Sequence, residues 1–294
     1  MIMKKIVSLA LLAVMTFATS VSAQIFWKVE KPGNEHVTYI LGTHHFAPLS
    51  ALDSLSQLQG ALENSDKLYG ELDMEKSMSP ESIMAMQQSL MAPADSTLDK
   101  VLTRAQLDSV KAALDPFTGG QLPMEMLYPM KPSALSTQIA AAMSMQIFPD
   151  LNPMEGLDKT MQDRAKALGK PVAGLETMEF QIDRIYGTPI AKQAKDLMKT
   201  IADMDGESER AIKLADSYMK HDINKLMELM IEEESDPEDY ERVLYSRNDN
   251  WVKQLLEEMP STSLMVVVGA GHLPGERGVL EQLRKAGYTV TPAE

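Results

Sequence analysis

The chain has 294 residues, of which 44% are hydrophobic and none is cysteine. Its formal net charge of −14 opposes nucleic acid and anionic lipid as partners. The absence of cysteine excludes a disulfide framework and thiolate metal sites. The length allows one large α/β domain or two small ones, and no low-complexity linker divides the chain.

The N-terminus has the features of an export signal. Lys4-Lys5 precedes an apolar run over 6–19, and Val21-Ser22-Ala23 matches a cleavage site between small residues. We therefore expect residues 1–23 to be removed and the mature chain, starting at Gln24, to be periplasmic or extracellular. No later stretch reaches 18 apolar residues, so we expect no integral membrane span in the mature chain. An uncleaved N-terminal anchor is the alternative.

Apolar runs and turn residues predict the elements in chain order. The runs over 25–29 and 37–41, with Pro32-Gly33-Asn34 between them, are typical of a β-hairpin. Helical periodicity and breaker residues predict the remaining elements. Further strands are expected over 68–72, 171–177, 264–268 and 288–290, and helices over 53–63, 98–114, 133–147, 158–168, within 181–230 and over 242–259.

This order of elements predicts an α/β fold with a mainly parallel sheet and flanking helices. The residues from 24 to 294 would form this single domain, with a helix-rich central insertion or lid over about 78–170. Many of the 23 methionines cluster in the helical region. They either fill a helical core or form an adaptable apolar surface.

A matched unit occurs near each end of the mature chain. The strand over 37–41 stops at Gly42-Thr43-His44-His45, and the strand over 264–268 stops at Gly269-Ala270-Gly271-His272. Open α/β sheets build their sites at the carboxyl ends of strands, so we expect His45 and His272 in one crevice. A third Gly-x-x-His match ends at His36. This match begins in the turn between two strands, so we expect His36 to be solvated.

Carboxylates accompany these histidines. Glu71 and Glu176 each fall near the carboxyl end of a predicted strand. Imidazole and carboxylate donors suit a divalent metal ion, and a nearby Glu can take a proton from a metal-bound water. Candidate metal ligands are thus His45, His272, Glu71 and Glu176. Arg247 is a candidate for neutralising a carboxylate or holding an oxyanion. For a single histidine, a hydrogen-bonded loop position is the structural alternative.

Together these segments resemble the TraB/GumN family, which includes the Tiki proteases and the pheromone-shutdown proteins. The likeness spans nearly the whole mature chain and keeps the motif order. The residues that carry it are 39–45, Glu71, Gly174-Leu175-Glu176-Thr177 followed by Gln181, Arg247-Asn248 before Trp251, and 268–272. Because Tiki members are Mn- or Co-dependent metalloproteases, the resemblance implies a metal-dependent active site at His45, His272 and Glu71.

Two functional hypotheses follow. The first is an exported metal-dependent hydrolase, best interpreted as a peptidase that acts on a peptide or protein substrate. Its divalent metal ion would be Mn or Co, with Zn as the further option. The second is a non-catalytic binding protein of the same fold that sequesters a peptide or haem-like ligand. The sequence contains no Gly-x-Ser-x-Gly elbow, phosphate-binding loop or His-Glu-x-x-His motif that would favour another chemistry. The residues leave the substrate, the native metal and the oligomeric state open.

Overall fold

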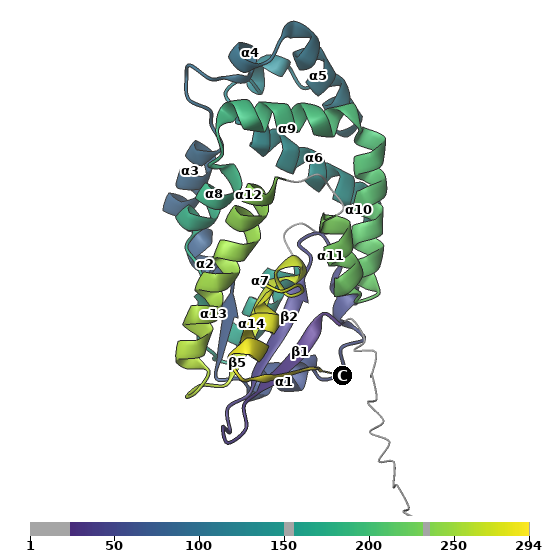
Figure 1. Cartoon of the computed structure of the whole chain (residues 1–294). Helices are drawn as coiled ribbons and strands as arrows, with labels where there is room; N and C mark the ends of the chain where they lie inside the picture. Colours follow the sequence, from purple (N-terminus) through teal and green to yellow (C-terminus); the bar gives the residue numbers. More distant parts are fainter. Residues whose placement is uncertain (1–23, 150–155, 232–235, 294) are drawn as a thin grey trace, which may run out of the picture.

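The computed structural model describes residues 24–149, 156–231 and 236–293 (Figure 1), so the predicted signal over 1–23 lies outside the described residues. The strands are β1 (Phe26–Glu30), β2 (Thr38–Thr43), β3 (Lys67–Gly70), β4 (Val172–Gly174), β5 (Leu264–Gly269) and β6 (Thr289–Pro292). The helices are η1 (Leu49–Leu52), α1 (Leu58–Asn64), α2 (Met74–Ser77), α3 (Pro80–Ser89), α4 (Leu98–Val101), α5 (Arg104–Thr118), η2 (Met124–Met126), α6 (Pro132–Ile147), α7 (Leu157–Ala167), α8 (Met178–Tyr186), α9 (Ile190–Ala202), α10 (Met204–Met219), α11 (Ile223–Ile231), α12 (Pro237–Tyr240), η4 (Glu241–Tyr245), α13 (Ser246–Glu258), η5 (Ala270–His272) and α14 (Val279–Lys285).

The described strands form one sheet in the order β4-β3-β5-β2-β1-β6. The first four run parallel, and β1 is antiparallel to both of its neighbours. The predicted α/β fold with a mainly parallel sheet is confirmed, as is the hairpin of β1 and β2. In β5 the residues 264–268 are fully buried, which explains their continuous apolar run, because a central parallel strand is covered on both faces.

Helices cover the sheet and build a second layer beyond its carboxyl edge. Helix α7 packs against β3, β4 and β5, while α4, α5, α6 and α9 lie at the far end of the molecule from the strands (Figure 1). A separate apolar core joins α4, α5 and α6 to α9. Helices α4, α5 and α6 of the predicted 78–170 segment therefore share this core with a helix that follows them in the chain, whereas α7 packs in the main core on the sheet.

Some helix boundaries differ from those expected. The helix expected over 53–63 begins only at Leu58, after η1 and a serine-containing turn. The helix expected over 98–114 is interrupted at Leu102, because Thr103 forms a capping box with Gln106 and starts α5 anew. Pro116 lies inside the last turns of α5, and the helix ends at a glycine with φ of 64°.

His221 joins two helices in an unusual conformation. It follows the end of α10 with a φ of 60°. Its Nε2 lies 3.1 Å from the carbonyl oxygen of Ala51, and the residue is half-buried. The side chain therefore ties the end of α10 to the segment that follows β2.

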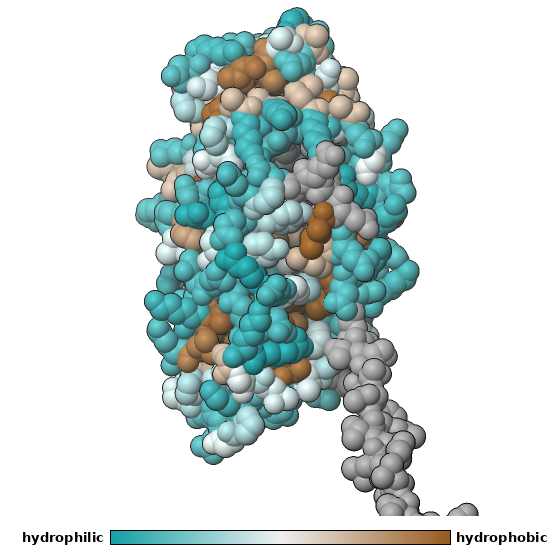
Figure 2. Space-filling model, in the orientation of Figure 1, coloured by the Kyte–Doolittle hydropathy of each residue, from teal (hydrophilic) through white to brown (hydrophobic). Residues whose placement is uncertain are grey.

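The surface is consistent with the acidic composition. Hydrophilic side chains dominate the face seen in Figure 2, where apolar residues form separate small patches. Over the described ranges, none of the helices combines the length and the apolar character that crossing a bilayer requires.

Candidate metal and catalytic site

Three strands end side by side at one edge of the sheet. Thr43 at the end of β2 pairs with Gly269 at the end of β5, and Gly70 at the end of β3 pairs with Val267. The residues that follow these strands therefore emerge at the carboxyl edge, where open α/β sheets place their ligand sites. Glu71 is the first of them, since it directly follows β3.

Arg247 is the centre of a buried ion network at this edge. Its side chain is 4% exposed and lies 2.6 Å from Oε2 of Glu71 and 2.7 Å from Oε1 of Glu176. Its Nε donates to both oxygens of Glu176 at 3.1 Å. Gln181 donates to both carboxylates, and the indole N–H of Trp251 donates to Glu176 at 3.0 Å. Each buried charge is thus paired and hydrogen-bonded, as burial requires.

The position of Arg247 depends on an irregular helix. The π-helix η4 directly precedes α13, and single π-helical turns are frequent at functional sites. The carbonyl of Val243 in this segment accepts a hydrogen bond from Nη1 of Arg247 at 3.0 Å. The arginine is therefore held by its own helix as well as by the two carboxylates.

Glu71 is ionised despite its burial. Burial opposes ionisation, yet it is outweighed at the acid pH where the carboxyl titrates, because His272 and His45 are then protonated and add their positive charge to that of Arg247; together they lower the pKa of Glu71 to about 2. The backbone N–H of Gly269 donates to its Oε1 at 2.8 Å. The same oxygen lies 3.9 Å from Nε2 of His272. A carboxylate is thus fixed beside a site histidine.

His272 is buried and neutral, because burial lowers its pKa to about 3. The amide nitrogen of Asn248 donates to the carbonyls of His272 and Arg277, which turns its Oδ1 toward the ring. We assign the ring proton to Nδ1 from this network, where the distance to Oδ1 is 2.6 Å. The lone pair of Nε2 then accepts from Nη1 of Arg247 at 3.1 Å.

His45 lies at the same edge of the sheet but outside the buried network. Its Nδ1 lies 3.2 Å from Oδ2 of Asp158, whose Oδ1 accepts from the hydroxyl of Thr43 at 2.9 Å. Asp158 raises the pKa of His45 to about 9. Because the His45 side chain is 64% exposed, water weakens this ion pair and its contribution to stability is small. Nε2 is the ring nitrogen that Asp158 does not engage, and it must lose its proton before it can bind a metal ion.

The adjacent His44 has the opposite environment. Its Nδ1 accepts the backbone N–H of Phe46 at 3.2 Å, and its ring lies 5.5 Å from that of Tyr218. Burial lowers the pKa of His44 to about 4. Two neighbouring histidines therefore differ in charge near neutral pH, His44 being neutral and His45 positively charged.

This environment of His44 predicts a pH dependence of stability. The unfolded chain takes up a proton near pH 6.5 while the folded chain does not, so stability is present above that pH and is lost as the pH falls toward about 4. The loss approaches about 1.4 kcal/mol per pH unit for one group. Urea unfolding at a series of pH values from about 7 to about 5 gives the free energy of unfolding, which should fall less steeply with decreasing pH in His44→Asn than in the wild type.

The variant retains an acceptor near the position of Nδ1. Phe46→Leu alters the same surroundings without removing a titratable group, so it should keep the wild-type slope. Equal slopes for the wild type and His44→Asn would contradict the prediction.

The candidate metal ligands meet one requirement of a metal site and leave another unmet. Each site histidine has its Nδ1 held by an oxygen, which orients Nε2 as the outer partners of metal-bound histidines do. However, Arg247 contacts Nε2 of His272 and the oxygens of Glu71 and Glu176. Within 24–149, 156–231 and 236–293, no three His, Asp or Glu side chains converge as a metal-binding group. The guanidinium is the cation at the centre of this arrangement.

Sequence reasoning assigned no role to the partners of the histidines. Asp158 is separated from His45 by 113 positions, and only the packing of α7 on the sheet brings them together. Asn248 follows Arg247 directly, so its place in the resemblance was a usable signal for a role beside His272.

A family model for TraB/PrgY/gumN proteins matches residues 25–292. The chain belongs to the TraB/PrgY/gumN family. It is 26% identical over 263 residues to YbaP of Escherichia coli (strain K12), covering 86% of this chain and 89% of that protein, and YbaP of Shigella flexneri gives the same values. Both relatives are described as uncharacterized proteins. The TraB/PrgY/gumN match contains both histidine loops and the whole Arg247 network, and it confirms the resemblance stated from the motifs.

Proposed function

We propose that this TraB/PrgY/gumN protein is an exported, metal-dependent hydrolase that cleaves peptides or proteins. The observation that carries the proposal is the ionised Glu71 at the edge from which both histidine loops emerge. Each histidine has one ring nitrogen held by an oxygen, which prepares the other nitrogen for a ligand. The resemblance to the Tiki proteases supports peptide bonds as the target.

We propose His45, His272 and Glu71 as the protein ligands, or Glu71 as the base beside two histidine ligands. Two imidazoles and a carboxylate suit Mn or Co, with Zn possible. The fourth candidate, Glu176, already accepts hydrogen bonds from Arg247 and from two neutral side chains. These contacts support a role for Glu176 in holding Arg247. Binding of an ion through His272 requires Arg247 to release Nε2 of that ring.

The side chains have complementary tasks in this proposal. A bound divalent ion would supply the acidity that brings the pKa of water toward neutrality. Glu71, with its low pKa and its fixed carboxylate, would accept a proton or orient the attacking water. Arg247 would stabilise negative charge on the carbonyl oxygen of the scissile bond, because a buried guanidinium acts strongly in a site shielded from water.

One observation favours the alternative of a non-catalytic binding protein. Every group of the Arg247 network is satisfied within the chain, including Nε2 of His272. A site that keeps this arrangement would bind a peptide or haem-like ligand at the sheet edge without turnover. Metal affinity therefore separates the two functions.

Calorimetry with Mn²⁺, Co²⁺ and Zn²⁺, paired with hydrolysis of a peptide library, tests the proposal. We expect the wild type to bind one of these ions and to cleave peptides only when it is present. His45→Ala and His272→Ala should each lower the metal affinity by more than about 100-fold, since an incomplete set of ligands remains. His36→Ala, a histidine substitution just before β2, is the matched control. A wild type without metal affinity or hydrolysis would leave the binding protein as the function.

A further inference from the structure

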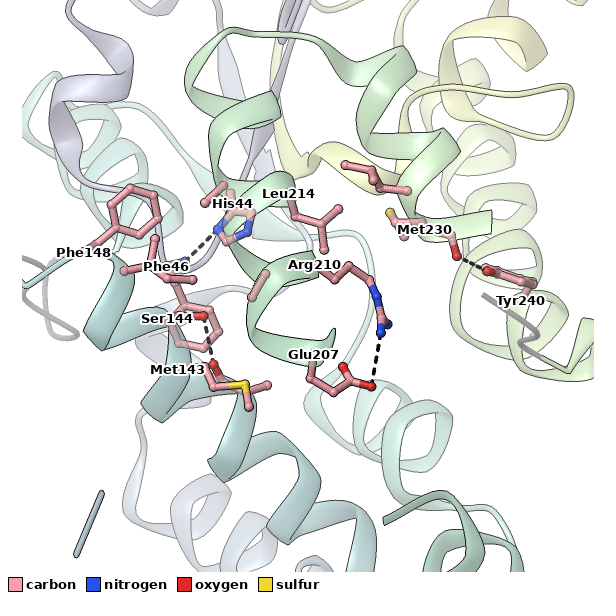
Figure 3. Close-up of a pocket in the computed structure, with 15 residues that line it drawn as sticks. His44, Phe46, Met143, Ser144, Phe148, Glu207, Arg210, Leu214, Met230 and Tyr240 are labelled. Atoms are coloured by element: carbon pink, nitrogen blue, oxygen red, sulfur yellow. Dashed lines mark hydrogen bonds and ion pairs between the residues drawn. The ribbon is translucent and has the colours of Figure 1, made fainter. Parts of the chain in front are cut away.

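A largely apolar cavity of about 430 Å³ opens between the sheet edge and the helical layer (Figure 3). Its volume lies within the range of small-ligand sites. Figure 3 shows the loop after β2 on one side and α10 on another, with the end of α6 and Met230 completing the walls. Its main side chains are His44, Phe46, Met143, Leu214, Leu229 and Met230.

One histidine loop lines this cavity, and the other packs against a residue of its wall. His44, which directly precedes His45, lines it. Met230 also lines it, and it lies so close to Gly271 that a Cβ on that glycine would come within 2.9 Å of the Met230 sulfur. Gly271 directly precedes His272. A group held in the cavity is therefore adjacent to the two loops that carry the site histidines.

The chemistry of the walls indicates what the cavity accepts. Its two charged residues, Glu207 and Arg210, pair with each other at 3.3 Å, and the hydroxyl of Tyr240 donates to the carbonyl of Met230. The charged pair and the Tyr240 hydroxyl thus have partners within the wall, so they do not compensate the hydration that a polar guest would lose. Methionine side chains adapt their shape to different apolar guests.

We propose that this cavity is the specificity pocket of the site and binds a large apolar side chain of a peptide substrate. The inference rests on the proposed function, because only a hydrolase at this sheet edge would place the bound side chain beside a scissile bond. The space accommodates leucine, methionine or phenylalanine. Asparagine at the same position of the peptide would be desolvated without matching hydrogen bonds, and glycine would leave the apolar walls uncovered.

Two neighbouring residues of α10 provide a matched pair of variants. Ala211 lines the cavity, whereas Ile212, the next residue, is 52% exposed and does not line it. Ala211→Trp should fill the cavity and weaken binding of an apolar peptide by at least about tenfold, and Ile212→Trp should leave it unchanged. If Ala211→Trp does not fold, Ala211→Leu, which adds less volume, takes its place.

The probes are capped pentapeptides with phenylalanine, leucine, asparagine or glycine at the central position. Calorimetry measures their binding to the full chain, and mass spectrometry measures their cleavage with Mn²⁺, Co²⁺ and Zn²⁺ added in turn. We expect the phenylalanine and leucine peptides to bind at least about tenfold more tightly than the asparagine and glycine peptides. Ala211→Trp should remove this preference.

The outcomes separate the pocket from the enzyme. Apolar preference in binding without cleavage would refute the hydrolase and leave the pocket standing. Cleavage without any preference at the central residue, or a preference that Ala211→Trp does not change, would overturn the pocket and leave the hydrolase standing. Absence of both binding and cleavage for all four peptides would count against both.

Discussion

Replacing Arg247 by alanine should lower the free energy of unfolding by about 3–5 kcal/mol. The substitution leaves the carboxylates of Glu71 and Glu176 buried, 9% and 4% exposed, without the cation that compensates them. Urea unfolding near neutral pH measures the change. Arg277→Ala is the matched control, because that arginine also pairs with two acids but is 40% exposed, and its loss should cost less than about 1 kcal/mol.

The same variant tests whether Arg247 occupies the position that a metal ion would take. If a divalent ion binds between the carboxylates and His272, Mn²⁺ should restore part of the stability lost in Arg247→Ala, since a ligand that binds only the folded state stabilises it. The wild type should gain less from Mn²⁺, because its guanidinium already occupies that position. Equal destabilisation by Arg247→Ala and Arg277→Ala would show that the buried network contributes no more than a surface pair.

Replacing Glu71 by glutamine should reduce peptide hydrolysis by about 10²–10⁴-fold, because an amide cannot accept the proton that a carboxylate takes. The amide oxygen can still accept the N–H of Gly269, so the strand end keeps its local contact. Initial rates at saturating Mn²⁺ measure the loss. Metal affinity measured in parallel decides the role: retained affinity identifies the base, and lost affinity identifies a ligand.

Glu176→Gln is the control for this substitution. Glu176 is as deeply buried and contacts the same arginine, but it also accepts from the indole N–H of Trp251, whereas Glu71 accepts from the backbone N–H of Gly269. A purely structural role for both acids predicts similar losses of activity in the two variants. A much larger loss in Glu71→Gln supports the chemical role, and equal losses would contradict it.

The strands were predictable because their signals are local. The run over 264–268 is apolar throughout, as a strand covered on both faces requires, and the glycine that follows it is the last residue of β5. The alternation of strands and helices then indicates a mainly parallel sheet. Helix boundaries were less predictable, because the break at Leu102 depends on the capping box of Thr103 and Gln106, which competes with continuous periodicity.

The candidate site was likewise predictable only in part. Glu71 and the two histidine loops follow strands directly, so their placement at one edge follows from strand order and direction. The contact of His45 with Asp158 depends on how α7 lies on the sheet, and that of Arg247 with His272 on the rotation of α13. Such contacts arise from tertiary packing, which one sequence does not encode in any local pattern.

The strand order has a consequence for how the molecule matures. β5 lies between β2 and β3, although it follows both by about two hundred positions in the chain. A nascent chain that has not reached residue 269 lacks the strand that joins the two halves of the sheet, together with His272. Closure of the sheet must therefore await synthesis of this late segment, and no partial product carries an assembled site. A truncated chain that ends before β5 should therefore be inert at this site, whatever else of it folds.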